Sequence, residues 1–166
     1  CHTYHHMYGT NVTCLRFFTV YGPRQRPGMA IRVFVGRVLD GEKIPVYGFG
    51  KPARDFAHVS DVVEGILAAL DHMGGYRTYN LGFSEAHSLM ELIRSIEVAV
   101  GKEARVELLP DQPGDVMVTF AGIDLAKAEL DWKPQISLDA GIEGFVKWYQ
   151  EIGRKLELEE DTTIPS

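Results

Sequence analysis

The stretch TCLRFFTVY, residues 13–21, constrains the fold more than any other part of the sequence. Nearly all of its residues are apolar, aromatic or β-branched, and the run stops at Gly22-Pro23. A strand buried on both faces of a parallel sheet has this composition, whereas a strand with one solvated face alternates apolar and polar residues. The stretch therefore predicts a strand inside a parallel sheet.

Helical patterns alternate with short strand patterns along the rest of the chain. Residues 30–40 place apolar side chains on one helix face, and Ser88 with Glu91 has the spacing of a capping box before a second apolar stripe. Asp61 and Glu64 have the same spacing, so we expect a helix to begin at Asp61. Further strands are expected at 44–47, 54–59, 78–81 and 106–109, and further helices after Asp124 and Ser137. This alternation predicts an α/β fold.

Charge and apolar content exclude several classes of function. The chain has 17 basic and 23 acidic side chains and a net charge of -6, which argues against nucleic acid or an anionic membrane as a partner. Every apolar run is shorter than the roughly 18 residues of a membrane span. Two cysteines without a secretory signal pattern do not suggest a disulfide scaffold, so we expect a cytoplasmic location.

The first residues, CHTYHHMYG, combine a cysteine with three histidines. His2 and His6 lie four residues apart and, on a helix, such a pair can hold a metal ion. No second cluster completes a tetrahedral site, so we expect no functional metal site. The alternative is that this segment is the end of a helix that begins before Cys1.

Three arginines are candidates for anion binding, because Arg24, Arg26 and Arg54 each stand beside a turn or a strand end. A guanidinium group beside backbone amides suits the clamping of a phosphate or carboxylate. The alternative for each is a surface or structural ion pair. The chain has no glycine-rich loop of the G-x-G-x-x-G or Walker type and no HExxH helix.

Several motifs occur in a fixed order: LRFFTVYGP at 15–23, Val46-Tyr47-Gly48, Arg54-Asp55-Phe56, QPGDV at 112–116 and Trp132-Lys133-Pro134. Together they resemble the second half of extended short-chain dehydrogenases (SDRs) of the NAD-dependent epimerase/dehydratase family, which act on nucleotide sugars. Within that family they are most similar to UDP-glucuronate 4-epimerases. The resemblance implies the C-terminal part of a Rossmann-type extended SDR, with the last strands of the sheet and a small substrate-binding α/β domain.

This resemblance divides the chain into three regions. Residues 1–24 would be a remnant of the dinucleotide-binding domain, 25–151 the substrate-binding region with a returning sheet strand near 78–82, and 152–166 a polar tail. The family's catalytic Tyr-x-x-x-Lys pair would lie about ten residues before Cys1 on this spacing. We therefore expect no catalytic residue here, and we expect NAD, the parent enzyme's cofactor, not to bind this chain alone.

The resemblance also implies contacts with the sugar and the diphosphate. Thr19 would face the sugar, and Arg26 would close over it from a mobile loop. Arg54 would contact the UDP diphosphate, and Asp115 would accept hydrogen bonds from the ribose hydroxyls. Gln112 stands where many relatives have a second diphosphate arginine, so its neutral amide should weaken that clamp.

The remaining implied contacts involve the uracil and the cofactor. The backbone of Val46 and Tyr47 would flank the uracil. Tyr21 and Pro23 would line the nicotinamide side if a cofactor domain is present. Four further residues are expected to be structural: His58 in mid-strand, Asp61 as a helix cap, and Trp132 and Trp148 in packing.

Three functions remain open at this point. The first is the UDP-sugar-binding part of an NAD-dependent epimerase that is inactive without its N-terminal half. The second is a free-standing UDP-sugar-binding module, and the third is a non-catalytic assembly protein derived from the family. Strands without their neighbours would expose apolar edges, so self-association is also expected.

Overall fold

The computed structural model describes residues 1–156, and its elements confirm the α/β prediction. Of the predicted polar tail at 152–166, residues 157–166 lie outside the described part. The chain divides into two compact units, each built from three separate segments. Unit 1 comprises Cys1–Val20, Arg54–Ala86 and Val118–Ile136, and unit 2 comprises Tyr21–Ala53, His87–Met117 and the residues from Ser137 onward.

The strands form three small sheets, in the orders β1-β5, β2-β4-β6 and β3-β7. The strands are β1 (Val12–Phe17), β2 (Thr19–Tyr21), β3 (Lys43–Val46), β4 (Ala53–His58), β5 (Tyr76–Leu81), β6 (Ala86–Ser88) and β7 (Arg105–Leu108). The α-helices are α1 (His2–Tyr8), α2 (Ala30–Asp40), α3 (Val59–Asp71), α4 (Leu89–Val100), α5 (Asp124–Leu130) and α6 (Leu138–Trp148). A short 3-10 helix, η1 (Tyr47–Gly50), and a short π-helix, η2 (Tyr149–Gly153), complete the set. None of the described helices is long and apolar enough to cross a membrane.

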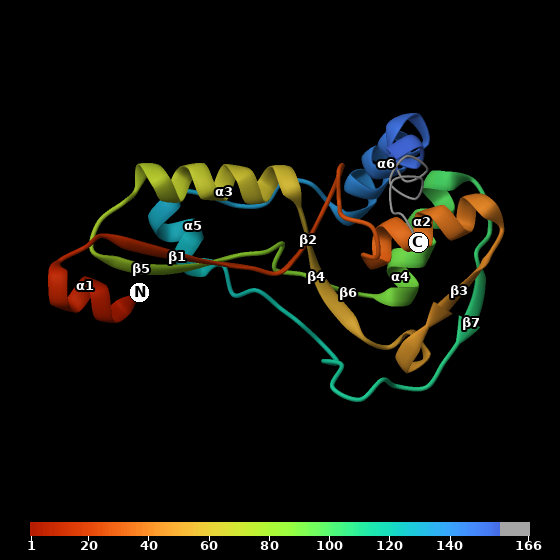
Figure 1. The fold of residues 1–166 in the computed structure, drawn as a ribbon, viewed down its shortest axis with the longest axis horizontal. Coiled ribbons are helices and arrows are strands. Elements are labelled where there is room, and N and C mark those ends of the chain that lie inside the picture. The colour runs from red at the N-terminus through yellow and green to blue at the C-terminus, as the bar shows by residue number, and fades with distance from the viewer. Residues whose placement is uncertain (157–166) are drawn as a thin grey trace, which may run out of the picture. The chain divides into compact units, whose positions relative to one another are not determined.

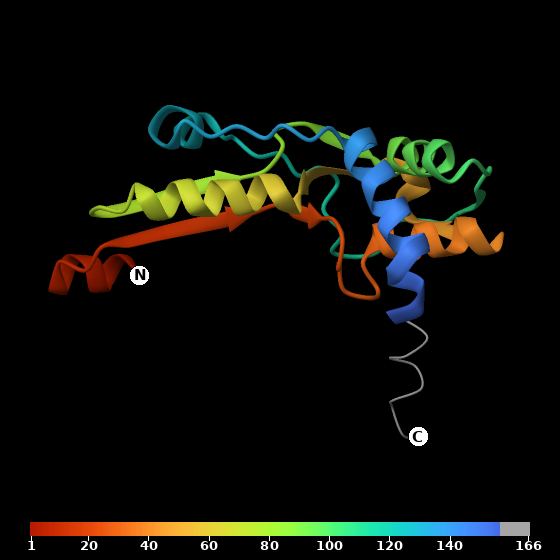
Figure 2. The same cartoon turned by 90° about the horizontal axis from the view of Figure 1, so that it is seen from above.

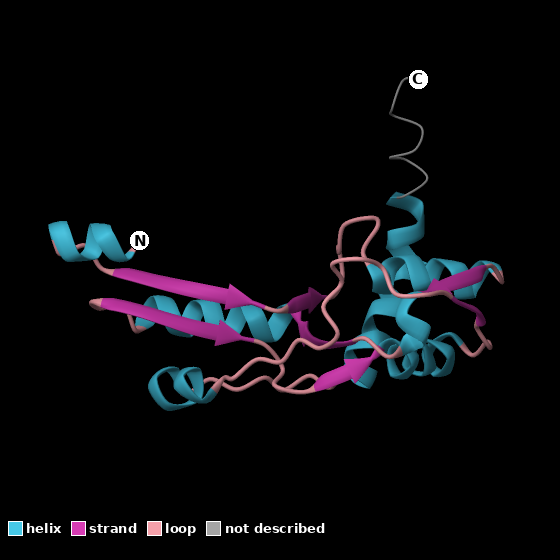
Figure 3. Ribbon diagram, turned by 90° about the horizontal axis from the view of Figure 1, so that it is seen from below, coloured by secondary structure: helices cyan, strands magenta, loops and turns pink. Residues whose placement is uncertain are grey.

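Unit 1 is built on the parallel pair β1–β5, whose register runs from Val12 opposite Tyr76 to Phe17 opposite Leu81. Figure 3 shows the two long arrows pointing the same way, and Figure 1 shows α3 running along them. Helix α3 approaches β5 so closely that a Cβ on Gly65 would lie 2.9 Å from a methyl group of Leu81. The buried core of this unit consists of Ala69, Tyr79, Leu81, Ala121, Ile123, Ala126, Leu130 and Trp132.

The apolar run at 13–21 forms two strands rather than one, because the chain breaks at Phe18 between β1 and β2. The burial predicted for it on both faces is wrong for this structure: Phe17 is 50% exposed and the rest of β1 is at best half-buried. Among the described strands, β1 pairs only with β5, so its other edge has no partner there. The parallel pairing itself is confirmed.

Unit 2 packs α4 against both α2 and α6 and adds the parallel pair β3–β7. Ser88 and Glu91 form the predicted capping box at the start of α4, and the hydrogen bonds from Ser88 lower the pKa of the Glu91 carboxyl. Helices α2 and α4 end at Gly41 and Gly101 in the left-handed conformation, as glycine permits. Figure 2 shows this set of helices from above. The most buried side chains of unit 2 include Ile31, Val35, Val38, Ile44, Leu92, Ile93, Ile96, Ile142 and Phe145.

The start of α3 differs from the prediction. The helix begins at Val59, and His58 is its N-cap, with the Nδ1 atom accepting a hydrogen bond from the Ser60 amide at 3.3 Å. Asp61 is not the cap but lies in the first turn, 2% exposed. Its carboxylate accepts hydrogen bonds from the amides of Gln135 and Ile136 at 3.1 and 3.0 Å. The residue expected to cap the helix instead holds a segment more than 70 residues away along the chain.

A second buried carboxylate joins three segments of unit 1. Asp55, on β4, is 0% exposed and accepts hydrogen bonds from the amides of Phe83, Ser84 and Ala121 at 2.6, 2.9 and 2.9 Å. Its own amide donates to the Thr119 hydroxyl at 3.2 Å. Charge-assisted bonds to backbone amides are among the stronger hydrogen bonds in proteins. Asp55 therefore fixes β4 against the segment after β5 and the segment before α5.

The partial burial of His58 at the start of α3 makes stability depend on pH. Burial lowers the pKa of His58 below 6.5, and the attraction of Asp61 offsets this only in part. The unfolded chain therefore takes up the proton first, so stability should fall as the pH drops through 6.5 and level off below the folded-state pKa.

His58→Asn tests this effect, because asparagine caps helices well and does not titrate in this range. Urea unfolding of both proteins between pH 8 and pH 5 should show a smaller loss of stability in the variant. Equal losses in the two proteins would contradict the assignment.

Asp55→Asn should destabilise unit 1 by about 3 kcal/mol, because an amide NH2 would face a backbone N–H in place of an accepting oxygen. The fluorescence of Trp132, in the core of unit 1, reports the unfolding in urea. The matched control is Asp71→Asn at the exposed end of α3, which should change stability by no more than about 0.5 kcal/mol. A D55N protein as stable as the D71N protein would refute this stabilising role of the Asp55 carboxylate, which we call the Asp55 clamp.

Candidate functional site

Two neighbouring segments of unit 2 hold four of the residues predicted to contact a substrate. Val46 ends β3 and Tyr47 begins η1. The Leu109 amide donates to the Val46 carbonyl at 2.8 Å, and the Phe49 amide donates to the Leu109 carbonyl at 3.1 Å. These bonds tie the end of β3 to the segment that leads into the turn holding Gln112 and Asp115.

Gly48 permits this close approach. It is left-handed, with φ of 61°, and a Cβ there would lie 2.7 Å from both the Asp111 carboxylate and the Pro52 ring. A larger residue would meet both the backbone strain and the steric clash. The motif Val-Tyr-Gly is thus explained by the proximity of β3 to residues 109–111.

The QPGD segment forms a turn, in which the Asp115 amide donates to the Gln112 carbonyl at 3.2 Å. Gly114 has φ of 87°, which suits glycine at this place in a tight turn. The side chains of Gln112 and Asp115 are both exposed. This loop therefore presents the Gln112 amide, which can donate to phosphate oxygens, and the Asp115 carboxylate, which can accept from hydroxyl groups.

Arg54 and Thr19 belong to unit 1. Arg54 is half-buried on β4, directly before the clamped Asp55, so the backbone that carries its guanidinium group is fixed. Thr19 is the half-buried first residue of β2. The structure brings Val46, Tyr47, Gln112 and Asp115 onto adjoining segments of one unit, and it places Arg54 and Thr19 in the other.

Tyr21 is held inside unit 2. It is 1% exposed, and its hydroxyl donates to the Leu138 carbonyl at 3.4 Å. A Cβ on Gly141 would collide with that hydroxyl, so the glycine in α6 makes room for the ring. Pro23, which follows, is exposed. The side chain of Tyr21 thus has a packing role in this structure, and the cofactor contacts of Tyr21 and Pro23 remain predictions.

Sequence reasoning overlooked one spacing. Tyr47 and Lys51 form a Tyr-x-x-x-Lys pattern, the spacing of the family's catalytic pair. The resemblance places that pair on a helix, but here Gly48 and Phe49 are left-handed, with φ of 61° and 52°. The two side chains therefore do not lie one turn apart on a helical face, and the pattern is not the expected pair.

The N-terminal histidines make aromatic and backbone contacts. The ring of His2 lies edge-on to Tyr76, with 5.0 Å between centroids, and the Nδ1 atom of His5 donates to the Thr10 carbonyl at 2.8 Å. Helix α1 ends at left-handed Gly9. Within residues 1–156, no group of three or more histidine, cysteine or acidic side chains is placed to hold a metal ion.

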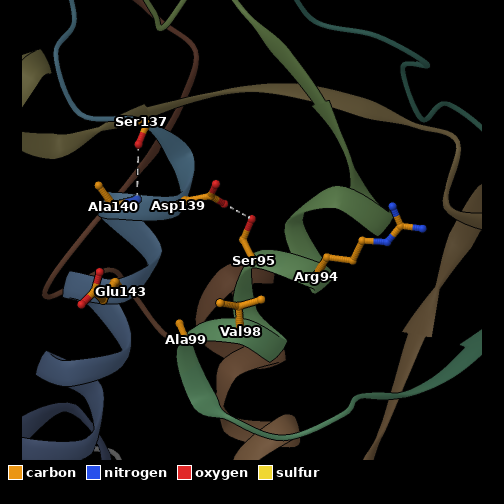
Figure 4. Close-up of a pocket in the computed structure, with 8 residues that line it drawn as sticks. All are labelled: Arg94, Ser95, Val98, Ala99, Ser137, Asp139, Ala140 and Glu143. Carbon is orange, nitrogen blue, oxygen red and sulfur yellow. Dashed lines mark hydrogen bonds between the residues drawn. The ribbon is translucent and has the colours of Figure 1, made fainter.

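A separate hollow of about 830 Å³ lies along α4 and α6 in unit 2, shown in Figure 4. Its polar contact joins the Ser95 hydroxyl to the Asp139 carboxylate at 2.5 Å, and Ser137 caps the start of α6. Val98 and Ala99 supply its apolar wall. None of the residues predicted to bind a substrate or cofactor lines this hollow.

Comparison with known proteins gives the chain a context. Residues 1–82 match the model of the NAD dependent epimerase/dehydratase family. A UDP-glucuronate 4-epimerase of Thermodesulfobacterium geofontis is 39% identical, over 90% of this chain and 46% of the relative. UDP-glucuronate 4-epimerase 5 of Arabidopsis thaliana is 41% identical, over 89% of this chain and 38% of its own length. The chain thus spans about half the length, or less, of these relatives.

Solved structures agree. UDP-glucuronic acid 4-epimerase from Bacillus cereus, in complex with UDP-glucuronic acid and NAD, superposes with a TM-score of 0.86 at 33% identity, over 92% of this chain and 49% of that one. UDP-glucose 4-epimerase from Thermotoga maritima gives a TM-score of 0.84 at 29% identity, over 90% of this chain and 49% of that one. These matches confirm the predicted fold, the C-terminal part of a Rossmann-type extended SDR, and the similarity to UDP-glucuronate 4-epimerases. Residues 1–82, just under half of this chain, thus match the NAD dependent epimerase/dehydratase family.

Proposed function

We propose that this chain is the UDP-sugar-binding part of an NAD-dependent epimerase that acts on UDP-glucuronate. One observation carries the proposal: the chain superposes over 92% of its length on a structure that contains UDP-glucuronic acid and NAD. The two segments of unit 2 that carry Val46, Tyr47, Gln112 and Asp115, and the fixed strand that carries Arg54, are consistent with it.

In this proposal each polar group has a binding task. Arg54 neutralises charge on the diphosphate. The hydrogen bonds to Asp55 fix the backbone next to Arg54, so less conformational entropy is lost when the ligand binds. Asp115 accepts hydrogen bonds from ribose hydroxyls, and the Gln112 amide donates to phosphate oxygens without adding charge. Thr19 and Arg26 contact the sugar, where a guanidinium group suits the carboxylate of glucuronate.

Epimerisation also needs chemistry that these binding groups do not provide. NAD, when bound, would supply the hydride transfer at the sugar, and the family's catalytic tyrosine would take the hydroxyl proton. In this chain, the hydroxyl of Tyr21 is already bound to Leu138 and Pro23 has no polar side-chain group, so these residues alone do not fit as an NAD site. We propose that the 166 residues by themselves bind substrate without turning it over, and that a dinucleotide-binding half is the natural partner.

An association function is favoured by a separate observation. Helix α3 exposes an apolar stripe at the spacing of one helix face, formed by Val63, Ile66, Leu67 and Leu70. Exposed apolar stripes of this kind are typical of surfaces that bind another protein. We propose that α3 mediates self-association of the isolated chain. Where a dinucleotide-binding half is present, we propose that α3 contacts that half instead. The proposed location of the protein is the cytoplasm, where Cys1 and Cys14 would remain thiols.

Calorimetric titration with UDP tests the binding proposal. The chain should bind UDP saturably, and Arg54→Ala should weaken binding by about tenfold or more, since a charge-assisted contact with the diphosphate is lost. The matched control, Arg94→Ala, removes an exposed arginine of α4 and should bind as the wild type does. The same samples, given UDP-glucuronate and NAD, should form no epimer.

Failure of UDP to bind, or equal binding by the R54A and R94A proteins, would refute the assignment of Arg54. Formation of epimer would refute the proposal that the isolated chain is inactive.

Sedimentation velocity tests the association proposal. The wild-type chain should sediment as more than a monomer at micromolar concentration, and Leu67→Glu should shift it to the monomer by placing a charge in the apolar stripe. Val98→Glu makes the same kind of change at an exposed position of α4 and should leave the association intact. A monomeric wild-type chain would rule out self-association through α3.

A further inference from the structure

A second hollow in unit 2, of about 450 Å³, gathers positive charge beside an aromatic ring. Arg24 and Arg26 reach it from the loop before α2, Arg32 from the first turn of α2, and Trp148 from the end of α6. Ile152 and Leu156 add an apolar wall. Of the residues predicted to bind a substrate or cofactor, only Arg26 lines it, so the hollow is not the predicted uracil and diphosphate site.

Arg32 is fixed in this hollow. It is 4% exposed, its Nη1 atom donates to the Gln25 carbonyl at 2.5 Å, and its guanidinium carbon lies 5.9 Å from the centroid of the Trp148 ring. The first contact ties α2 to the loop, and the second lies at the outer limit of the cation–π range. The guanidinium group therefore keeps its place before any ligand arrives.

Arg24 is held in a conformation that its residue type disfavours. Its φ is 67°, in the left-handed region that residues with a Cβ rarely adopt. Such strain costs about 1 kcal/mol or more, and it persists only where the surrounding structure imposes it. The strained backbone places the Arg24 side chain beside the hollow, where it adds a third positive charge.

Three guanidinium groups around one hollow repel one another, and an anion among them turns this repulsion into attraction. Phosphate suits the arrangement better than a carboxylate, because it carries up to two charges and three strongly accepting oxygens. The indole ring and the apolar wall suit a flat or apolar group attached to the phosphate. We propose that this hollow binds the phosphate of a small phosphorylated molecule, with the rest of the molecule against Trp148 and Ile152.

Occupancy of the hollow has a consequence for the proposed epimerase substrate, and this step rests on the proposed function. Arg26 cannot hold a phosphate here and close over a sugar at the same time. A phosphorylated molecule bound in the hollow therefore competes with closure of the loop over the UDP-sugar, so it acts as an inhibitor of substrate binding.

Tryptophan fluorescence of the whole chain tests the site directly. Inorganic phosphate is titrated at constant ionic strength, with chloride as the balancing anion. Trp148 lines the hollow, while Trp132 is buried in unit 1 and serves as a constant background. We expect a saturable change that is absent in Trp148→Phe, and tighter binding of phenyl phosphate than of phosphate because the aromatic group adds contact with the apolar wall.

Arg24→Gly is the decisive variant, because glycine relieves the strain at φ of 67° while it removes the charge. It should weaken phosphate binding about tenfold without loss of stability in urea. Arg94→Ala, which removes an equal charge elsewhere in unit 2, should bind as the wild type does. A response that does not saturate, that chloride reproduces, or that Arg24→Gly leaves unchanged would overturn the proposal.

This result is separable from the UDP titration. UDP binding that is lost in Arg54→Ala but kept in Arg24→Gly supports the substrate site, whatever the phosphate titration shows. Phosphate binding that is lost in Arg24→Gly supports the hollow, even where UDP fails to bind.

Discussion

The carboxylate of Asp55 is the interaction on which unit 1 depends. It is fully buried, and it would be costly to bury without compensation, but three backbone amides from two separate segments donate to it. The same amides would have no partner if the carboxylate were removed. This mutual requirement joins strand β4, the segment after β5 and the segment before α5 into one body, and it fixes the backbone that carries Arg54.

Unit 2 carries exposed polar side chains on a loop next to a buried core. Apart from Arg32, the side chains that its helices bury are apolar, while Gln112 and Asp115 remain at the surface. The loop that carries them is fixed at one end by backbone bonds to β3, which Gly48 permits through its missing Cβ. Rigid secondary structure thus positions residues that are themselves solvated, as binding loops require.

Local features of this fold could be predicted from the sequence, because they depend on neighbours in the chain. The capping box at Ser88, the helix at 30–40 and the parallel pairing of the strand that begins the 13–21 run were predicted from spacing and composition. Asp61 shows where such reasoning fails: its spacing to Glu64 imitates a capping box, yet its partners are the amides of Gln135 and Ile136. A pattern of neighbouring residues cannot predict a hydrogen-bond partner that lies so far away along the chain.

The candidate site shows the same division. The residues at the site could be named only through resemblance to a family, since an arginine beside a turn has many structural uses. The arginine hollow was not foreseen as a unit, although Arg24 and Arg26 were noted, because Arg32 and Trp148 join them only through the packing of α2 near the end of α6.

The discontinuous make-up of each unit bears on how the chain is made. Unit 1 takes its last segment from Val118–Ile136, and unit 2 draws on residues from Tyr21 to beyond Ser137. On a ribosome, β1 and β5 emerge long before the amides of Gln135 and Ile136 that bond to Asp61. Unit 1 cannot close before residues 118–136 have been made, and unit 2 cannot close before the residues after Ser137 have been made, so the apolar strands made first remain incompletely covered during that interval.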